Sequence, residues 1–108
     1  MATLSKIKTL RDALNGLGIP LYHYKALNQP APYVVWSEDG FSQAERGDGK
    51  IQDYTLGGTV DYFTKTEYDP AADLIQDTLN DAGFPLWLEF VGYEDDTGLI
   101  HYQWVFEV

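Results

Sequence analysis

The sequence predicts an α+β domain in which two α-helices pack on one face of an antiparallel β-sheet, in the order α-β-β-β-α-β-β. Three observations predict this fold. Leucines recur at helical spacing near the N-terminus, aromatic and β-branched residues alternate through the second half, and a well-marked helix interrupts that alternation. With 108 residues, 44% of them hydrophobic, the chain is expected to form one domain (1–108) around one core.

The first expected helix runs from about Leu4 to Leu17. Its apolar residues recur three or four positions apart: Leu4, Ile7, Leu10, Leu14 and Leu17. Gly16 and Gly18 are predicted to end it, because glycine readily adopts the left-handed conformation that follows many helices. Two short strands are expected next, at 21–25 and 33–37, with a proline-containing turn between them.

A long polar segment, 38–52, separates these strands from the rest of the chain. It contains three glycines and lacks both the helical and the strand period. The segment is either a mobile loop or a long hairpin arm that extends beyond the core. Because loops of this length in compact domains are usually functional or disordered, we favour a function for it.

A third strand, 53–65, and a second helix follow. One face of the strand is expected to hold Tyr54, Leu56, Val60 and Tyr62, and the other Thr55, Thr59, Asp61 and Phe63. The Gly57–Gly58 pair predicts a bulge or bend. The helix is expected to start with Asp69 as N-cap and Pro70 at its first position, and to stop at Gly83. Its predicted buried stripe is Ala71, Leu74, Ile75, Thr78, Leu79 and Ala82.

The chain is expected to close with a hairpin of strands 86–93 and 99–108. Gly98, in the connecting loop 94–98, suits a left-handed backbone position. One face of the last strand is predicted to hold Ile100, Tyr102, Trp104, Phe106 and Val108. The other is predicted to hold Leu99, His101, Gln103, Val105 and Glu107.

Charge and cysteine content exclude several classes of protein. The net charge is −10, and its distribution is uneven: residues 1–37 carry four basic residues and one acidic, whereas 38–108 carry three basic and sixteen acidic. So few cations argue against binding to nucleic acid or to an anionic membrane, and no apolar run is long enough for a transmembrane helix. The absence of cysteine excludes disulfides and thiolate chemistry and fits intracellular synthesis. The imbalance suits a basic protein partner, or head-to-tail contact between copies.

No group of side chains predicts catalysis, so we expect no enzyme activity and no cofactor or metal. His23 and His101 each precede a tyrosine, but Lys25 and Gln103 stand where a paired-histidine phosphoesterase would need hydroxyl residues. Both histidines are therefore interpreted as half-buried strand residues with satisfied ring nitrogens. The acidic clusters do not match a calcium loop, and the segment 47–50 (GDGK) lacks the spacing of a phosphate loop.

Two stretches, FTKTEYDPAADLIQDTLNDAG (63–83) and LEFVGYEDDTGLIHYQWVFEV (88–108), resemble the small tail-terminator proteins of long-tailed bacteriophages, also described as tail-completion or tail-to-head joining proteins. The N-terminal leucine helix, the strand PYVVWSE and the polar arm also fit, so the resemblance covers most of the chain. The resemblance implies a sheet with two packed helices, which agrees with the fold predicted from the residues.

The resemblance also implies a function in assembly. Such a protein forms a ring, here expected to be a hexamer, which caps the tail tube, ends polymerisation of the tube protein and offers a surface to a head-completion or neck protein. Its place would be the tail or neck of the virion, after synthesis in the cytoplasm of the bacterial host. The interaction residues expected in the arm are Glu38, Asp39, Phe41, Glu45, Arg46, Asp48 and Lys50.

Three alternatives stay open at this point. The chain could be a head–tail neck adaptor, which would share the size and the ring-forming habit. It could instead be a small-ligand or peptide-binding module that uses the aromatic face of its sheet. A carboxylate-based hydrolase is the third alternative, and only the abundance of acidic residues supports it.

Overall fold

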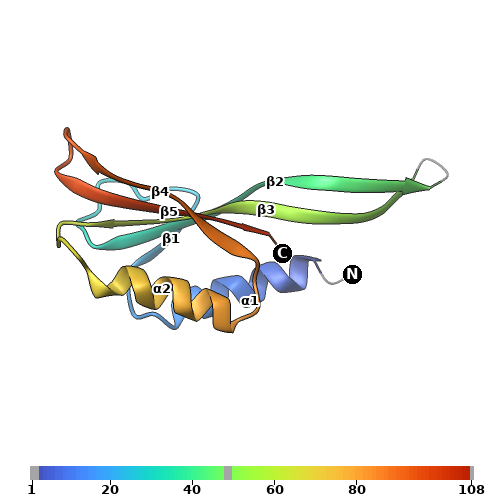
Figure 1. The fold of residues 1–108 in the computed structure, drawn as a ribbon, viewed down its shortest axis with the longest axis horizontal. Helices are drawn as coiled ribbons and strands as arrows, with labels where there is room; N and C mark the ends of the chain where they lie inside the picture. Colours follow the sequence, from blue (N-terminus) through green and yellow to red (C-terminus); the bar gives the residue numbers. More distant parts are fainter. Residues whose placement is uncertain (1–2, 48–49, 108) are drawn as a thin grey trace.

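The computed structural model describes residues 3–47 and 50–107, and the side chains of 5–39 and 56–107. The α+β class and the predicted order of elements are confirmed (Figure 1). The elements are α1 (Thr3–Asn15), β1 (Leu21–His23), β2 (Tyr33–Gly47), β3 (Lys50–Thr64), α2 (Pro70–Asp81), β4 (Leu86–Glu94) and β5 (Leu99–Glu107). Neither described helix is long and apolar enough to cross a membrane.

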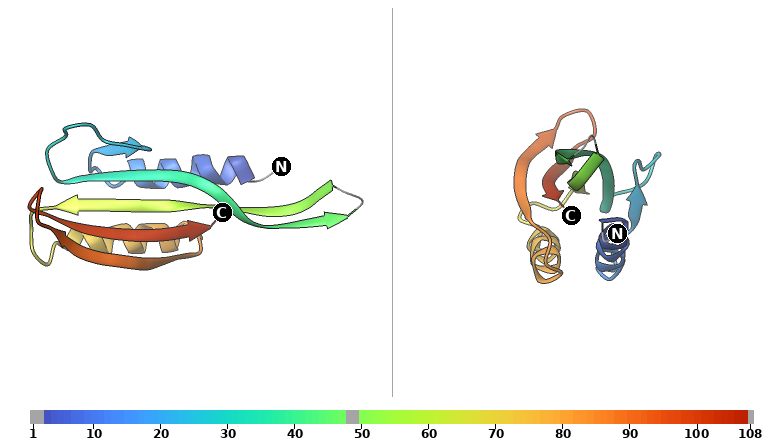
Figure 2. Two further views of the ribbon diagram at one scale, coloured as in Figure 1. Left: turned by 90° about the horizontal axis from the view of Figure 1, so that it is seen from above. Right: turned by 90° about the vertical axis from the view of Figure 1, so that its right-hand side faces the viewer.

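The five strands form one mixed sheet in the order β1-β2-β3-β5-β4. The antiparallel prediction holds for every pair except β1 and β2, which run parallel with Leu21 opposite Val34. Figure 2 shows the reason: the segment 24–32 carries the chain back before β2 begins, so both strands point the same way. Tyr24 and Asn28 both take positive φ within this return, and Tyr24 ends β1 two residues earlier than predicted.

Both helices cover the same face of the sheet, as predicted (Figure 1). Leu10 and Leu14 of α1 and Ile75 and Leu79 of α2 are fully buried against it. The sheet supplies six buried side chains of the core, the aromatic Trp36, Tyr62, Trp104 and Phe106, with Val34 and Val60. At about 1.5–3 kcal/mol for each large apolar side chain, burial on this one face is the main source of stability.

The first helix ends at Asn15, two residues before the predicted limit. The amide of Gly16 donates to the carbonyls of Asp12 and Ala13, and Leu17 N donates to Leu14 O. These bonds tighten the last turn, and Gly18 then takes a φ of +75°. The glycine stop signal was thus placed correctly, although the helix ends two residues before the predicted limit.

The start and stop of α2 are confirmed. The Asp69 carboxylate accepts a hydrogen bond from Ala71 N at 2.9 Å, and Gly83 ends the helix with a φ of +90°. The predicted stripe is partly wrong, because Leu74 is 49% exposed and Ala82 is exposed, whereas Ala72 is buried. The side of the helix that packs on the sheet is formed by Ala72, Ile75 and Leu79. Which side is buried depends on where the sheet lies relative to the helix.

The polar segment 38–52 is an arm, the second of the two alternatives. β2 and β3 stay paired as far as Gly47 and Lys50, and the molecule measures 51 × 26 × 22 Å (Figure 1). Beyond Gly57, which faces the end of β5 at Glu107, the described part of the arm consists of two strands.

The irregularity predicted at the glycine pair lies on the opposite strand. The β2–β3 register shifts between Glu38 and Gly40, which face Gly58 and Gly57. Gly58 is needed for close approach: a Cβ there would lie 2.0 Å from Ser37 O and 2.7 Å from Phe106 Cζ. The arm therefore begins at a point where three strands crowd together.

Candidate interaction surface

The predicted interaction residues fall into two groups. Phe41, Glu45 and Arg46 lie on β2, within the arm. In the strand register Arg46 lies opposite Ile51, and the next pair is Gly47 with Lys50. The backbone positions of Arg46 and Lys50 are therefore close together near the far end of the arm. Glu38 and Asp39 lie at its base instead. Asp48 lies outside the described residues.

Glu38 is bound within the molecule, which the sequence did not indicate. Its carboxylate accepts a hydrogen bond from Tyr24 OH at 2.7 Å and contacts His23 Nε2 at 3.0 Å. The His23 ring stacks between Tyr24 and Trp36, with centroids 4.0 Å away on each side. These contacts hold the end of β1 against β2 at the position where the arm begins.

The pKa values at this position follow from the contacts. Partial burial acts to raise the pKa of Glu38, but the hydrogen bonds from Tyr24 and His23 outweigh it and hold the pKa below its ordinary value. The same carboxylate raises the pKa of Tyr24. Glu38 is therefore a charged internal anchor for the arm, and Asp39, which is exposed, is the member of the pair that faces solvent.

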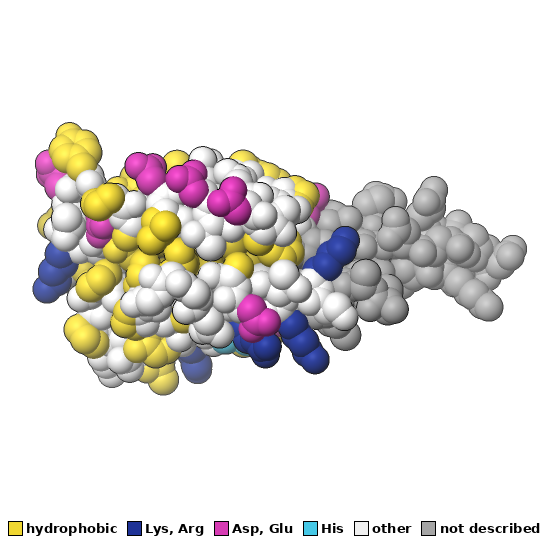
Figure 3. Space-filling model, turned by 90° about the horizontal axis from the view of Figure 1, so that it is seen from below, with side chains coloured by type: hydrophobic (Ala, Val, Ile, Leu, Met, Phe, Trp, Pro, Cys, Tyr) yellow, Lys and Arg dark blue, Asp and Glu magenta, His cyan; other side chains and the backbone are white. Residues whose placement is uncertain are grey.

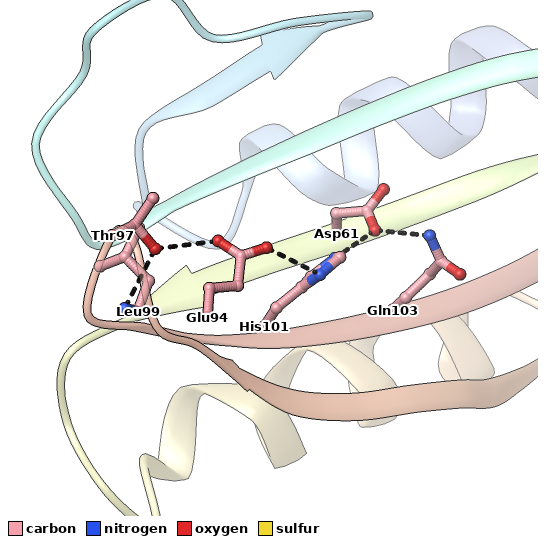
Figure 4. Close-up of polar contacts among 6 residues, drawn as sticks. All are labelled: Asp61, Glu94, Thr97, Leu99, His101 and Gln103. Carbon is pink, nitrogen blue, oxygen red and sulfur yellow. Dashed lines mark hydrogen bonds and ion pairs between the residues drawn. The ribbon is translucent and has the colours of Figure 1, made fainter.

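A polar network occupies the sheet face that the helices leave open (Figure 4). The Nε2 atom of His101 contacts Asp61 Oδ1 at 2.6 Å, and its Nδ1 atom lies 3.5 Å from Glu94 Oε2. Gln103 donates to the same Asp61 oxygen at 2.9 Å. Since both ring nitrogens of His101 face carboxylates, the ring joins β3, β5 and the end of β4 and has no nitrogen directed at solvent.

This geometry confirms the interpretation of His101 as a half-buried histidine with satisfied nitrogens. For His23 one ring contact is shown, from Nε2 to Glu38, and its side chain is 40% exposed. Among the residues whose side chains are described, no three His, Asp or Glu come close enough to hold a metal ion. The arrangement can order the sheet, but it does not assemble a nucleophile with a free base.

Aromatic rings cross the open face from one edge of the sheet to the other. Successive ring centroids lie 4.4–6.1 Å apart across all five strands, in the order Tyr22, Tyr33, Phe63, His101 and Phe90. The predicted alternation placed Phe63 and His101 away from the core, but only the strand register brings them together. Four of these five rings are partly buried in the isolated chain, and Phe90 is exposed.

The outer strand β4 exposes more apolar side chain than any other described element. It lies at the edge of the sheet, so one side of its backbone has no strand partner among residues 3–47 and 50–107. Its large apolar side chains are 45–65% exposed: Trp87, Leu88, Phe90, Val91 and Tyr93. A group of exposed apolar residues on an edge strand is the kind of surface that protein–protein contacts use, so β4 is a candidate interaction site.

A groove of about 370 Å³ lies where the segment 28–31 meets Tyr33, Lys65, Thr97 and Leu99. It is open to solvent, and Lys65 is the one charged side chain that lines it. A small-molecule site usually encloses its ligand and directs polar groups at it. This groove would enclose a ligand only weakly, and its polar groups converge only weakly. The edge and the arm are therefore stronger candidate sites.

Comparison with models of known protein families finds no match to this chain, and comparison with curated proteins also finds none.

Proposed function

We propose that this chain is a structural assembly protein of a long-tailed bacteriophage. It forms a hexameric ring that caps the tail tube, ends polymerisation of the tube protein and presents a surface for the head-completion or neck protein. Its site of action is the tail or neck of the virion, after synthesis in the bacterial cytoplasm. The proposal starts from the sequence resemblance, and one structural observation supports it most.

That observation is the two-stranded arm. An isolated two-stranded ribbon is marginally stable in water at best, and it becomes stable when a third strand or another surface packs against it. In the described chain, no other strand pairs with β2 or β3 beyond Gly57. An arm that projects from a well-packed core therefore suits a protein whose final contacts are made with neighbouring subunits.

The remaining surface agrees with such a role. The apolar side chains of β4 and the aromatic rings of the open sheet face suit protein contacts, whereas His101 has both ring nitrogens engaged. A closed ring of identical subunits uses one surface of each copy against a different surface of the next. The two unlike edges of this sheet, β1 and β4, meet that requirement.

Mass measurement across a concentration series tests the proposal, by light scattering after size exclusion and by negative-stain imaging of the largest species. We expect a ring of about six copies with a central hole. Such a ring should also bind to the end of isolated tail tubes and stop their growth. Compact dimers, or rings that leave tube growth unchanged, would refute it.

The arm is tested by reversing its two cations, Arg46→Glu with Lys50→Glu. Assembly should weaken by at least tenfold in concentration, because the cations would no longer meet acidic groups on a partner, while far-UV circular dichroism of the monomer stays the same. The matched control is Lys65→Glu, an exposed cation just after β3 and outside the arm. Equal assembly of the arm variant and the control would contradict a role for the arm.

A further inference from the structure

The two edges of the molecule differ in charge. Figure 2 shows α1 lying beside β1 and β2, and α2 beside β5 and β4. Exposed Lys6, Lys8 and Arg11 lie on α1, while exposed Asp73, Asp77 and Asp81 lie on α2. Viewed from the helix side, acidic groups gather along α2 and basic groups along the α1 side (Figure 3). We name these sides the basic edge (α1 and β1) and the acidic edge (α2 and β4).

The acidic residues of α2 and the exposed strand β4 lie on the same side of the molecule (Figure 2). Gln76, which lies between Asp73 and Asp77 on α2, accepts a hydrogen bond from Trp104 of β5 at 3.1 Å. This side of the helix therefore borders the strands that end in β4. No Lys or Arg occurs between Thr66 and Gly98, so the acidic charge of this edge is uncompensated by its own sequence.

The basic edge carries matching apolar groups. Tyr24 and Leu27, which follow β1 directly, are 59% and 64% exposed. β1 is also an edge strand, so its outer backbone groups have no strand partner in the described sheet. Each edge thus offers three features together: an open strand, exposed large apolar side chains and a net charge. The net charge of α1 is positive although Asp12 pairs with Arg11, and that of α2 is negative.

We propose that the acidic edge is a docking surface for the basic edge of a second copy of this chain. Opposite charges would then face each other across the contact, with Tyr24 and Leu27 of one copy near the apolar side chains of β4 of the next. Contact between two acidic edges would instead bring like charges together around a dehydrated apolar strand, which opposes association. The interface is consequently head to tail, and every copy keeps one edge free for the next.

This assignment depends on the proposed function only for closure of the ring. A head-to-tail contact gives a ring if the rotation between copies closes, and an open filament if it does not. The edges and the ring can therefore be tested separately.

The test uses two variants that reverse one edge each. The first carries Lys6→Glu and Lys8→Glu on α1, and the second carries Asp73→Lys and Asp77→Lys on α2. All four positions are exposed, so the fold of each monomer should survive, as thermal unfolding will show. We expect each variant alone to lose self-association by at least tenfold in concentration, because the net charges of its α1 and α2 then have the same sign.

Mixing the two variants should restore association. The reversed α1 edge of one then meets the reversed α2 edge of the other, and the remaining unmodified edges also match. Light scattering of the mixture should show mixed species, which higher salt should weaken since the contacts are partly electrostatic. Should a reversal unfold the chain, the neutral pairs Lys6→Gln with Lys8→Gln and Asp73→Asn with Asp77→Asn replace it, and each should weaken association.

Each outcome bears on a definite claim. If either variant alone associates as the wild type does, or if the mixture fails to recover, the edge assignment is overturned, while a persisting ring would still support the proposed function. If the mixture recovers but forms open filaments, the edge assignment stands and the ring proposal fails. A wild-type chain that stays monomeric at every concentration overturns the edge assignment.

Discussion

The two faces of the sheet use the same strands in different ways. On the face that the helices cover, Val60, Tyr62, Trp104 and Phe106 are at most 1% exposed and pack as a dry core. One position along the same strands, the open face holds Asp61, His101 and Gln103 in a charged, hydrogen-bonded network. The comparison teaches that stability resides in one face, while the other remains available for polar ordering and for contact.

The largest expected effect separates two neighbouring residues of β5. Trp104→Ala should lower the free energy of unfolding by about 3–5 kcal/mol, because it empties a large buried volume and removes the hydrogen bond to Gln76. Val105→Ala, on the open face, should cost about 1 kcal/mol or less. Urea unfolding of both variants measures the difference, and similar losses would show that the open face is also core.

The covered face should also reject a single added methyl group. Gly58→Ala places a Cβ against Ser37 O and the Phe106 ring, so strands must move apart at the base of the arm, at a cost of about 1–3 kcal/mol. Gly16→Ala is the matched control, because its nearest contact would be an ordinary 3.4 Å from Ala13 O. Thermal unfolding should rank the two, and a stable Gly58→Ala chain would refute the crowding.

A smaller effect is expected where the covered face meets α2. Tyr62 OH and Thr64 Oγ1 both donate to Asp69 Oδ2 at 2.7 Å. Burial acts to raise the pKa of Asp69, but these bonds and that from Ala71 N outweigh it, so its pKa lies below the ordinary 3.8. A lowered pKa stabilises the fold above pH 3.8, and this contribution is lost as the pH falls through the folded-state pKa.

Replacement of the Asp69 carboxylate should therefore lower the free energy of unfolding most near neutral pH. Asp69→Asn should cost about 1 kcal/mol there, and the variant should lose less stability on acidification than the wild type does. Asp96→Asn, an exposed acid in the closing hairpin loop, serves as the control. The free energy of unfolding is measured at pH 7 and pH 3 for the wild type and both variants. An equal loss of stability between the two pH values in all three proteins would contradict this role of Asp69.

The smallest effect is expected on the open face. Asp61→Asn removes a charged acceptor from His101 and Gln103, but the site is partly solvated, so the cost should be about 1 kcal/mol or less. The imidazole NMR shifts of His101 should change, since its Nε2 partner loses its charge. An unchanged imidazole spectrum would mean that the pair does not form in solution.

Local signals in the sequence were sufficient for most of the fold. Helical spacing, the Asp69–Pro70 start, the helix stops at Gly18 and Gly83 and the left-handed loop position at Gly98 act over a few residues, and the structure confirms them. The direction of β1 could not be read in the same way. It depends on the path of 24–32, which includes left-handed backbone at Asn28 and also at Tyr24, a residue type that gives no signal for that conformation.

The contacts of the candidate site were largely beyond sequence reasoning. His101 and Asp61 are 40 residues apart, and Glu38 and His23 are 15 apart, so their pairing depends on strand order and register. Alternation did place Asp61 and His101 off the core face, which was the one usable signal. Leu74 was assigned to the wrong side of α2 because helical spacing defines a stripe more loosely than the approach of the sheet does.

The continuity of β2 and β3 has a mechanical consequence. Each strand runs for 15 residues from the helix-covered sheet into the arm, through the crowded position at Gly58. The core and the arm thus share two continuous strands, so a rotation of the sheet against its helices would also move the arm. A contact made by the arm and the packing of the core are therefore coupled through β2 and β3.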